Sequence, residues 1–463
     1  MPCSKACDRC HALKSVCLSG PAGNCYRCYR LHRTCTFSRR RGKRGPKPRP
    51  GVRTPTYTSS ASSNAERSRT VSPLVTDESR DNPNLPTPAA TPAMTILHQE
   101  TLLTRVSAPT GLSICSFFTF GPQLSMDMYR TICSRAANAP LLLLKPYAAV
   151  SRVFIRCSTN QSPCSDTDWS VCASALQTLR NAHIKSPTNG VSFVALGMSL
   201  VTFHRLVSGI SASTICRFTL ALIRPYYYAG QLSESDSMEL TCLIFLDTTQ
   251  SLFRARVPVI EYRVLDPWRV DQHAGLCGSL LPLLYRLCIL AAAVKSGVVS
   301  SVPPSCFDEL ALELHAWSPN VSSCLLERFS EGEALLLTTQ ANAHRTGALL
   351  YLHRLRYPFG ERNEQADELS ASIIDTLEHC LAVTGQLPPN MTLTLLVAGA
   401  EVQNMVDRQR ILYLVSRILG STFYPFIANL RLFLWRVWSG RDRGRTQYLF
   451  QLFQEDLNLS IPL

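Results

Sequence analysis

Six cysteines near the start of the chain have a spacing that suits metal binding. Two blocks, CDRCHALKSVC (7–17) and CYRCYRLHRTC (25–35), share the pattern Cys-x2-Cys-x6-Cys. Thiolates are strong zinc ligands, and structural zinc takes four ligands in a tetrahedron. A Cys-x2-Cys pair brings two sulfurs to one metal across the first turn of a helix, where the helix dipole favours the thiolate. The sequence predicts zinc ligation by Cys7, Cys10, Cys17, Cys25, Cys28 and Cys35.

Three thiolates in each block leave each zinc ion one ligand short. If two zinc ions share two sulfurs, six thiolates supply eight bonds and the cluster carries a charge of −2, which the nearby Lys and Arg residues offset. Two independent fingers would need eight ligands, and His11 and His32 lack the usual finger spacing. A disulfide framework is not expected in an intracellular chain, and unligated cysteines would not explain the repeat. We therefore predict a two-zinc cluster, with Cys3 outside it.

The positive charge of the chain is concentrated around this cluster. Residues 1–55 contain 14 Lys and Arg residues and one acidic residue, Asp8, a net charge of +13. The rest of the chain contains 33 basic and 32 acidic residues, so almost all of the +14 lies in the first eighth. A field this concentrated indicates a polyanionic partner.

A basic arm, residues 37–55, follows the cluster. Its segment RRRGKRGPKPRP (39–50) has 7 cationic residues among 12 and no aromatic residue, and its Gly and Pro residues oppose helix and sheet. We expect an extended arm that follows phosphates, enters a minor groove, acts as a nuclear import signal, or does several of these. Neutralising about five phosphates would make log K fall with log[salt] at a slope near about −4.5. The expected contacts are Arg39, Arg40, Arg41, Lys43 and Arg44.

The rest of the chain divides into a linker and a large helical region. Residues 56–109 are rich in Ser, Thr, Pro and Asn, and we predict a disordered linker there. Residues 110–463 show helical periodicity, for example in DELSASIIDTLEHCLAVTG (367–385), where Gly385 is the expected terminator. We predict an all-helical domain; the best strand candidate is VPVIEYRVL (257–265). The scattered remaining cysteines are interpreted as small core residues in a reducing compartment.

Several other classes of protein are disfavoured. No secretory signal is expected, and the apolar run 280–294 is interpreted as a buried helix, so no membrane partner is predicted. No motif of a hydrolase, a metalloprotease, a nucleotide-binding protein or a dinucleotide-binding protein is present, so the chain is not predicted to be an enzyme. His204 and His344 are interpreted as core or half-buried residues, and RDRGR (441–445) as a solvated helix end.

The intervals Cys7-x2-Cys10-x6-Cys17-x7-Cys25-x2-Cys28-x6-Cys35 resemble the binuclear zinc cluster of fungal Zn2Cys6 transcription factors. The resemblance implies that Cys7 and Cys25 bridge the two zinc ions and that Pro21 shapes the turn between the halves. It also implies that Lys14 contacts bases and that the half-site is a CGG-like triplet. The sequence departs from the family at His11, where Arg or Lys is common, and at 15–16, where another basic residue is frequent.

Each block also carries side chains suited to DNA. Lys and Arg make the strongest contacts to guanine in the major groove, whereas most contacts go to phosphates. Lys14 is the expected base contact, and the arginines of the second block are expected mainly at phosphates. For His11 a phosphate contact and a surface role stay open. The predicted set is Arg9, His11, Lys14, Arg27, Arg30 and Arg33.

Three C-terminal blocks resemble the fungal-specific transcription factor domain that commonly follows this cluster: ALLYLHRLRY (348–357), LTLLVAGAEVQNMVDRQRI (393–411) and LWRVWSGRDRG (434–444). The resemblance implies a helical regulatory domain that binds an effector or a co-regulator. Residues 95–106 offer under two heptads, too few for a coiled coil. DNA binding as a monomer, or as a homodimer through the helical domain, therefore stays open.

Together these features predict a nuclear, RNA polymerase II-dependent transcription factor that binds double-stranded DNA through two zinc ions. Its targets would be a metabolic or secondary-metabolite gene set. The alternative is a zinc module that binds RNA or single strands without sequence-specific regulation.

Overall fold

Two units make up the chain, Met1–Pro86 and Thr87–Leu463, and each is described by itself. The computed structural model describes residues 7–12, 17, 25, 28, 34–38, 109–159, 164–208, 212–232, 237–297, 303–321, 325–418 and 424–455. The predicted linker and basic arm lie outside these residues except at their ends. The boundaries predicted between cluster, arm, linker and helical domain therefore stay predictions.

Helices make up the secondary structure of the described residues. The first unit contains α1 (Asp8–Ala12). The second unit begins with α4 (Pro109–Phe118), α5 (Pro122–Asn138), α6 (Pro140–Ser158), α7 (Asp166–Arg180), α8 (Pro187–Ser208), α9 (Ser213–Tyr228) and α10 (Ser237–Arg254). It continues with η3 (Cys277–Leu280), α11 (Leu281–Lys295), α12 (Pro304–Ala316), α13 (Leu325–Arg328), α14 (Glu331–Arg356), α15 (Asn363–Thr384), α16 (Thr392–Glu401), α17 (Met405–Arg417), α18 (Tyr424–Arg441) and α19 (Leu449–Glu455). The all-helical prediction for this region is confirmed.

The best strand candidate, residues 257–265, is not a strand: these residues form irregular chain, and no strand occurs in the described part of the molecule. Side chains, not a neighbouring strand, satisfy the backbone here. The N–H of Glu261 donates to the hydroxyl of Tyr228 at 3.1 Å, and the N–H of Arg263 donates to the hydroxyl of Tyr227 at 2.7 Å. The apolar alternation therefore reflects packing against α9.

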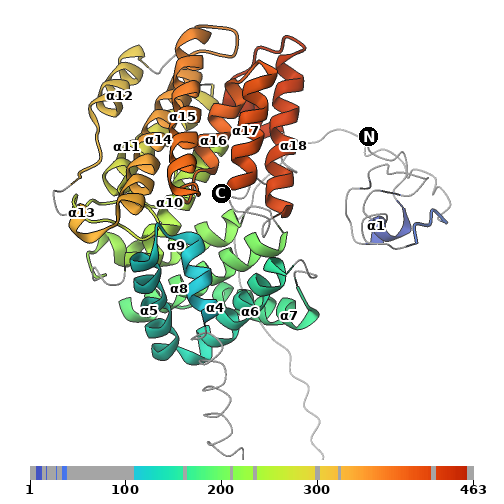
Figure 1. Ribbon diagram of the computed structural model, residues 1–463. Helices are drawn as coiled ribbons and strands as arrows, with labels where there is room; N and C mark the ends of the chain where they lie inside the picture. The colour runs from blue at the N-terminus through green and yellow to red at the C-terminus, as the bar shows by residue number, and fades with distance from the viewer. Residues whose placement is uncertain are drawn as a thin grey trace, which may run out of the picture. The chain divides into compact units, whose positions relative to one another are not determined.

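Helix α10 connects two groups of helices in the second unit (Figure 1). On one side, α4, α5, α6, α7, α8 and α9 pack as neighbouring pairs. On the other side, α14 packs on α15 and α16, and α16 packs on α17 and α18. Helix α10 contacts α8 and α9 of the first group and also α11 and α19. Helix α10 is linked to the second group through α11 and α19, which both contact α14.

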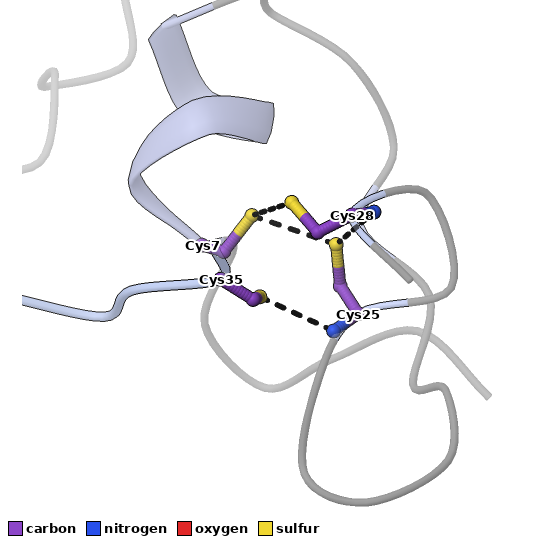
Figure 2. A group of neighbouring side chains, drawn as sticks. All are labelled: Cys7, Cys25, Cys28 and Cys35. Atoms are coloured by element: carbon purple, nitrogen blue, oxygen red, sulfur yellow. Dashed lines mark hydrogen bonds between the residues drawn. The ribbon is translucent and has the colours of Figure 1, made fainter. Parts of the chain in front are cut away.

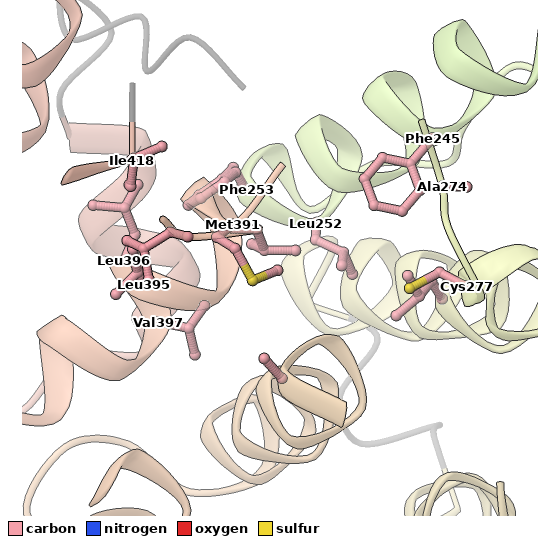
Figure 3. Close-up of a cluster of buried hydrophobic side chains, with 14 of the residues drawn as sticks. Phe245, Leu252, Phe253, Ala274, Cys277, Met391, Leu395, Leu396, Val397 and Ile418 are labelled. Carbon is pink, nitrogen blue, oxygen red and sulfur yellow. The ribbon is translucent and has the colours of Figure 1, made fainter. Parts of the chain in front are cut away.

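A large apolar core runs through this unit, with two smaller buried clusters besides it. Phe245, Leu252 and Phe253 of α10 are buried in this core. In Figure 3, Leu252 and Phe253 lie beside Met391, with Leu395 and Leu396 of α16 beyond it, whereas Phe245 lies beside Ala274. Burial of apolar surface contributes about 25 cal/mol for each Å² removed from water. Because both helix groups supply side chains to this core, burial of its apolar surface favours both groups folding together.

The amphipathic patterns predicted the C-terminal helices well. In α15, Ile373, Leu377 and Cys380 are buried, and the helix ends at Gly385, whose φ of 75° is in the left-handed region that favours glycine. His344 is also buried, as predicted, and Thr394 lies 3.2 Å from its Nδ1.

Two helical segments, Pro187–Ser208 and Cys277–Lys295, have the length and the apolar composition of a bilayer span. Their most apolar windows are 61% and 50% buried inside the protein, respectively. Core helices of this kind satisfy the same criterion, so length and composition alone do not place these segments in a membrane.

A fully buried ion pair joins α14 to α16. The guanidinium of Arg354 donates to both carboxylate oxygens of Glu401, each at 2.8 Å, and neither side chain is exposed. Its other three N–H groups donate to the carbonyls of Pro358 (3.0 Å) and Glu361 (2.9 Å) and to the side chain of Asn363 (2.9 Å). All five donors of Arg354 are therefore satisfied, which is what a buried guanidinium requires.

Replacing Arg354→Met should lower the free energy of unfolding by about 3–5 kcal/mol, because buried Glu401 would keep only the more distant Arg441, at 3.8 Å, as a cationic partner. Urea denaturation followed by circular dichroism measures this change. Arg410→Met is the control: Arg410 also pairs with carboxylates, but its side chain is 31% exposed, so we expect a loss of about 1 kcal/mol or less. Equal losses in the two variants would contradict the role given to Arg354.

Candidate metal centre

The sulfur atoms of the two cysteine blocks lie together in the first unit. The Sγ of Cys7 is 3.6 Å from that of Cys25 and 3.8 Å from that of Cys28, and the Sγ of Cys10 is 3.7 Å from that of Cys25. Figure 2 shows Cys7, Cys25 and Cys28 pointing toward one another, with Cys35 beside the backbone of Cys25. The fold therefore gathers thiols that are up to 28 residues apart in the sequence.

The cysteines form two groups of four that could each hold a metal ion. One group is Cys7, Cys25, Cys28 and Cys35; the other is Cys7, Cys10, Cys17 and Cys25. Within each group the sulfurs lie within 4.8 Å of one another. Cys7 and Cys25 belong to both groups, so two tetrahedral sites here would share these two sulfurs.

The distances suit zinc and exclude disulfides. A zinc ion with four sulfurs at about 2.3 Å places the sulfurs about 3.8 Å apart, the edge length of that tetrahedron. The separations of 3.6–3.8 Å agree with this edge. A disulfide would need sulfurs about 2.0 Å apart. The donor set is all thiolate, which zinc prefers, so the residues present fit this metal.

The two blocks have the same local geometry. The N–H of Cys10 donates to the Sγ of Cys7 at 3.4 Å, and in the second block the N–H of Cys28 donates to the Sγ of Cys25 at 3.3 Å. The third cysteine of each block is held in the same manner: Cys17 accepts from Cys7 N–H at 3.3 Å, and Cys35 accepts from Cys25 N–H at 3.2 Å. The repeated spacing in the sequence thus produces a repeated structure.

These N–H groups favour the ionised thiols that a metal requires. Burial raises the pKa of Cys25, but the N–H of Cys28 and the neighbouring thiols outweigh burial and lower the pKa to about 6. For Cys28, burial and the nearby Cys25 raise the pKa instead. Neighbouring thiolates therefore oppose one another's ionisation, and a bound cation would remove that opposition.

A clasp between Asp8 and Ser38 was missed by sequence reasoning. The carboxylate of Asp8, at the start of α1, accepts hydrogen bonds from the N–H (2.9 Å) and the hydroxyl (2.8 Å) of Ser38. The N–H of Asp8 also donates to the carbonyl of Thr36 at 2.9 Å. The clasp fixes where the chain leaves the cysteine cluster. One signal could have pointed to it: Asp8 is the sole acidic residue in 1–55.

Most of the predicted DNA contacts are not in the described part of the chain. Arg9 lies on α1 and is exposed. His11 lies on the same helix, and nothing is described of its side chain. The others fall outside the described residues: Lys14, Arg27, Arg30, Arg33, Arg39, Arg40, Arg41, Lys43 and Arg44. All of these contacts stay predictions.

The cysteines of the second unit do not form a comparable cluster. Among the described residues, the two groups above are the only sets of Cys, His, Asp or Glu arranged to hold a metal. Cys115, Cys216 and Cys380 are buried, as predicted for small core residues, but Cys306 is exposed, so the prediction was wrong for Cys306. The spacing of the six N-terminal cysteines, rather than the total number of cysteines, is thus the informative signal.

The three C-terminal sequence blocks meet at the buried ion pair. Arg354 belongs to the first block and Glu401 to the second, and Arg441 of the third donates to the carbonyls of Ala400 and Glu401. The side chain of Arg441 is only 9% exposed. The interpretation of RDRGR as a solvated helix end was therefore wrong for Arg441, because its charge faces the carboxylate of Glu401.

The described residues thus comprise a thiol cluster that could hold metal and, later in the sequence, a large all-helical unit. Residues 113–459 match the family model for the fungal specific transcription factor domain. This match spans most of the chain, so the protein belongs to that family and is a transcription regulator, which in general acts in the nucleus. No curated protein and no solved structure matches the chain.

The sharing of Cys7 and Cys25 predicts unequal effects of two single substitutions. Cys25→Ser removes a ligand from both groups and should abolish metal binding, whereas Cys10→Ser should remove about one ion and leave the other. Native mass spectrometry of the full chain counts the bound ions. Cys115→Ser, a buried cysteine outside the cluster, is the control and should retain both. Equal metal loss in Cys10→Ser and Cys25→Ser would contradict the sharing.

Proposed function

We propose that this protein is a sequence-specific DNA-binding transcription factor of the Zn2Cys6 type. Six thiolates, from Cys7, Cys10, Cys17, Cys25, Cys28 and Cys35, hold two zinc ions, with Cys7 and Cys25 bridging. The supporting observation is that two groups of four sulfurs share these two residues, next to a strongly basic segment, on a chain of the fungal transcription factor family.

In this proposal the zinc ions are structural, and the chain's own residues contact DNA. Lys14 contacts the bases of a CGG-like triplet, and the arginines of both blocks and the arm bind phosphates. The protein acts in the nucleus on genes that RNA polymerase II transcribes, without catalysis. Removing zinc should unfold the cluster, because metal binding and folding are coupled in small metal domains.

The deciding experiment is an electrophoretic mobility shift with the full, zinc-loaded chain. A CGG-containing duplex should bind at least about tenfold more tightly than a scrambled duplex, since each good base contact discriminates by about 1–3 kcal/mol. Equal affinities would leave only charge-driven binding. A preference for single strands would instead support the general nucleic-acid module. Chelation should abolish the specific shift while leaving the helical unit folded.

Lys14→Ala should relax the preference for the CGG duplex by about tenfold, because it removes a base contact. Its effect on the salt dependence should be small: the slope of log K against log[salt] should change by about one or less. Arg44→Ala in the arm is the matched control, and it should weaken both duplexes equally. Fluorescence anisotropy at several salt concentrations measures both quantities. The assignment fails if Lys14→Ala changes the slope but not the preference.

Because Asp8 forms the clasp with Ser38, we expect its replacement to change DNA affinity in the direction opposite to that expected from its charge alone. Removing an acidic residue beside DNA should by itself strengthen binding. If the clasp positions the arm, Asp8→Ala should instead weaken binding several-fold, whereas Asp8→Asn, whose oxygen still accepts a hydrogen bond, should not. Anisotropy with the CGG duplex at fixed salt tests this, and the zinc content should be unchanged. Stronger binding by Asp8→Ala would refute a positioning role.

A further inference from the structure

A cavity in the second unit lies apart from the cysteine cluster and from the ion pair of Arg354. Its wall is formed by α4, α5, α6, α8 and the start of α10, together with the loop that follows α10. The space available to a ligand measures about 70 Å³. This is about half of the roughly 150 Å³ of an apolar cavity that binds benzene, so an occupant must be small and the wall must move to admit it.

The wall is mainly apolar and can adjust. Ile114, Phe118, Met128, Ile132, Val150 and Met198 contribute to it. Methionine is unbranched and flexible, so Met128 and Met198 can move to fit an occupant. Three hydroxyls in the wall are bonded within their own helices: Ser151, Ser199 and Thr202 donate to backbone carbonyls at 3.0, 2.8 and 3.0 Å.

The charges in the wall are matched. Glu239, near the start of α10, is buried, and its carboxylate accepts from the Nε of Arg135 of α5 at 3.4 Å. Nearby Tyr147 is buried, and burial, followed by the charge of Glu239, raises the pKa of its phenol well above the usual value. The wall therefore offers no net charge for an ionic ligand, which favours an uncharged one.

His273 contributes a ring nitrogen to this wall. His273 is 2% exposed, and among the described residues nothing hydrogen-bonds to its Nε2. Its backbone is fixed, because its carbonyl accepts from Asn390 at 3.0 Å and its N–H donates to Asp271 at 2.8 Å. Burial lowers the pKa of the ring, so it is neutral near pH 7. A buried polar atom without a partner is costly, and a ligand that bonds to it recovers the loss.

We propose that this cavity binds a small, uncharged, mainly apolar molecule whose single hydroxyl or carbonyl group hydrogen-bonds to His273. The apolar wall supplies the affinity, and the histidine supplies the selectivity. The proposal does not rest on the DNA-binding function, because occupancy is measured on the protein without DNA.

Phenol and toluene are suitable probes, since they differ by one hydroxyl in place of a methyl group. Isothermal titration calorimetry on the full chain should show saturable binding of both. In His273→Phe, the ratio of the toluene Kd to the phenol Kd should fall about tenfold. A factor of ten corresponds to about 1.4 kcal/mol, the contribution of one lost hydrogen bond. His344→Phe is the matched control: it is equally buried, and its Nε2 also has no partner among the described residues, but it does not line the cavity. It should keep the wild-type ratio.

Met198→Trp, which fills the cavity, should weaken both probes at least tenfold, and circular dichroism verifies that each variant is folded. The proposal is overturned if phenol shows no saturable binding to the wild type or if Met198→Trp binds like the wild type. It is also overturned if folded His273→Phe keeps the wild-type ratio. If His273→Phe does not fold, phenol binding to the wild type and to Met198→Trp tests the proposal.

Discussion

The helical unit depends on an ion pair that has no access to water. Arg354 and Glu401 are fully buried, and taking both charges out of water costs several kcal/mol for each ion. The pair is tolerated because every N–H of the guanidinium has an acceptor, including two carbonyls in the loop before α15 and the side chain of Asn363, the first residue of α15. The ion pair thus fixes the position of that loop as well as the spacing of α14 and α16, and Arg441 ties α18 to the same point.

The cysteine cluster depends on a different kind of stabilisation. The buried apolar cluster found in the first unit consists of cysteines alone, so, among its described residues, no aliphatic or aromatic core is present to offset the entropy of ordering. Domains this small commonly require a metal or disulfides. The separations of 3.6 Å and more rule out disulfides for the sulfur pairs measured, which leaves metal–sulfur bonds as the stabilising interaction that we propose.

The features that could be predicted are those that leave a regular spacing of residues in the sequence. The face of α15 that contains Ile373 and Leu377 followed from apolar spacing, and the gathering of the thiols followed from a repeated interval. The sequence did not predict contacts between single residues far apart in the chain. Arg441 was interpreted as solvated because its partner Glu401 lies 40 residues away, and the clasp of Asp8 depends on Ser38, 30 residues away. At 257–265, tyrosine hydroxyls of α9 replace the strand partner that the alternation suggested. Such pairings are set by tertiary packing, which local patterns do not encode.

The charge distribution assigns DNA binding and small-molecule binding, the two activities that we propose, to different parts of the chain. Residues 1–55 carry +13 of the net charge of +14, so attraction to a polyanion is a property of the first unit and its arm. The remaining chain, nearly neutral overall, adds little to that attraction, and a ligand in the uncharged wall around His273 would change it little. Any influence of the helical unit on transcription must therefore act through packing or through contacts with another protein, rather than through long-range electrostatics. Occupancy of the cavity is one way to alter such packing, because its wall includes α4 and α5 as well as α10, the helix that joins the two helix groups.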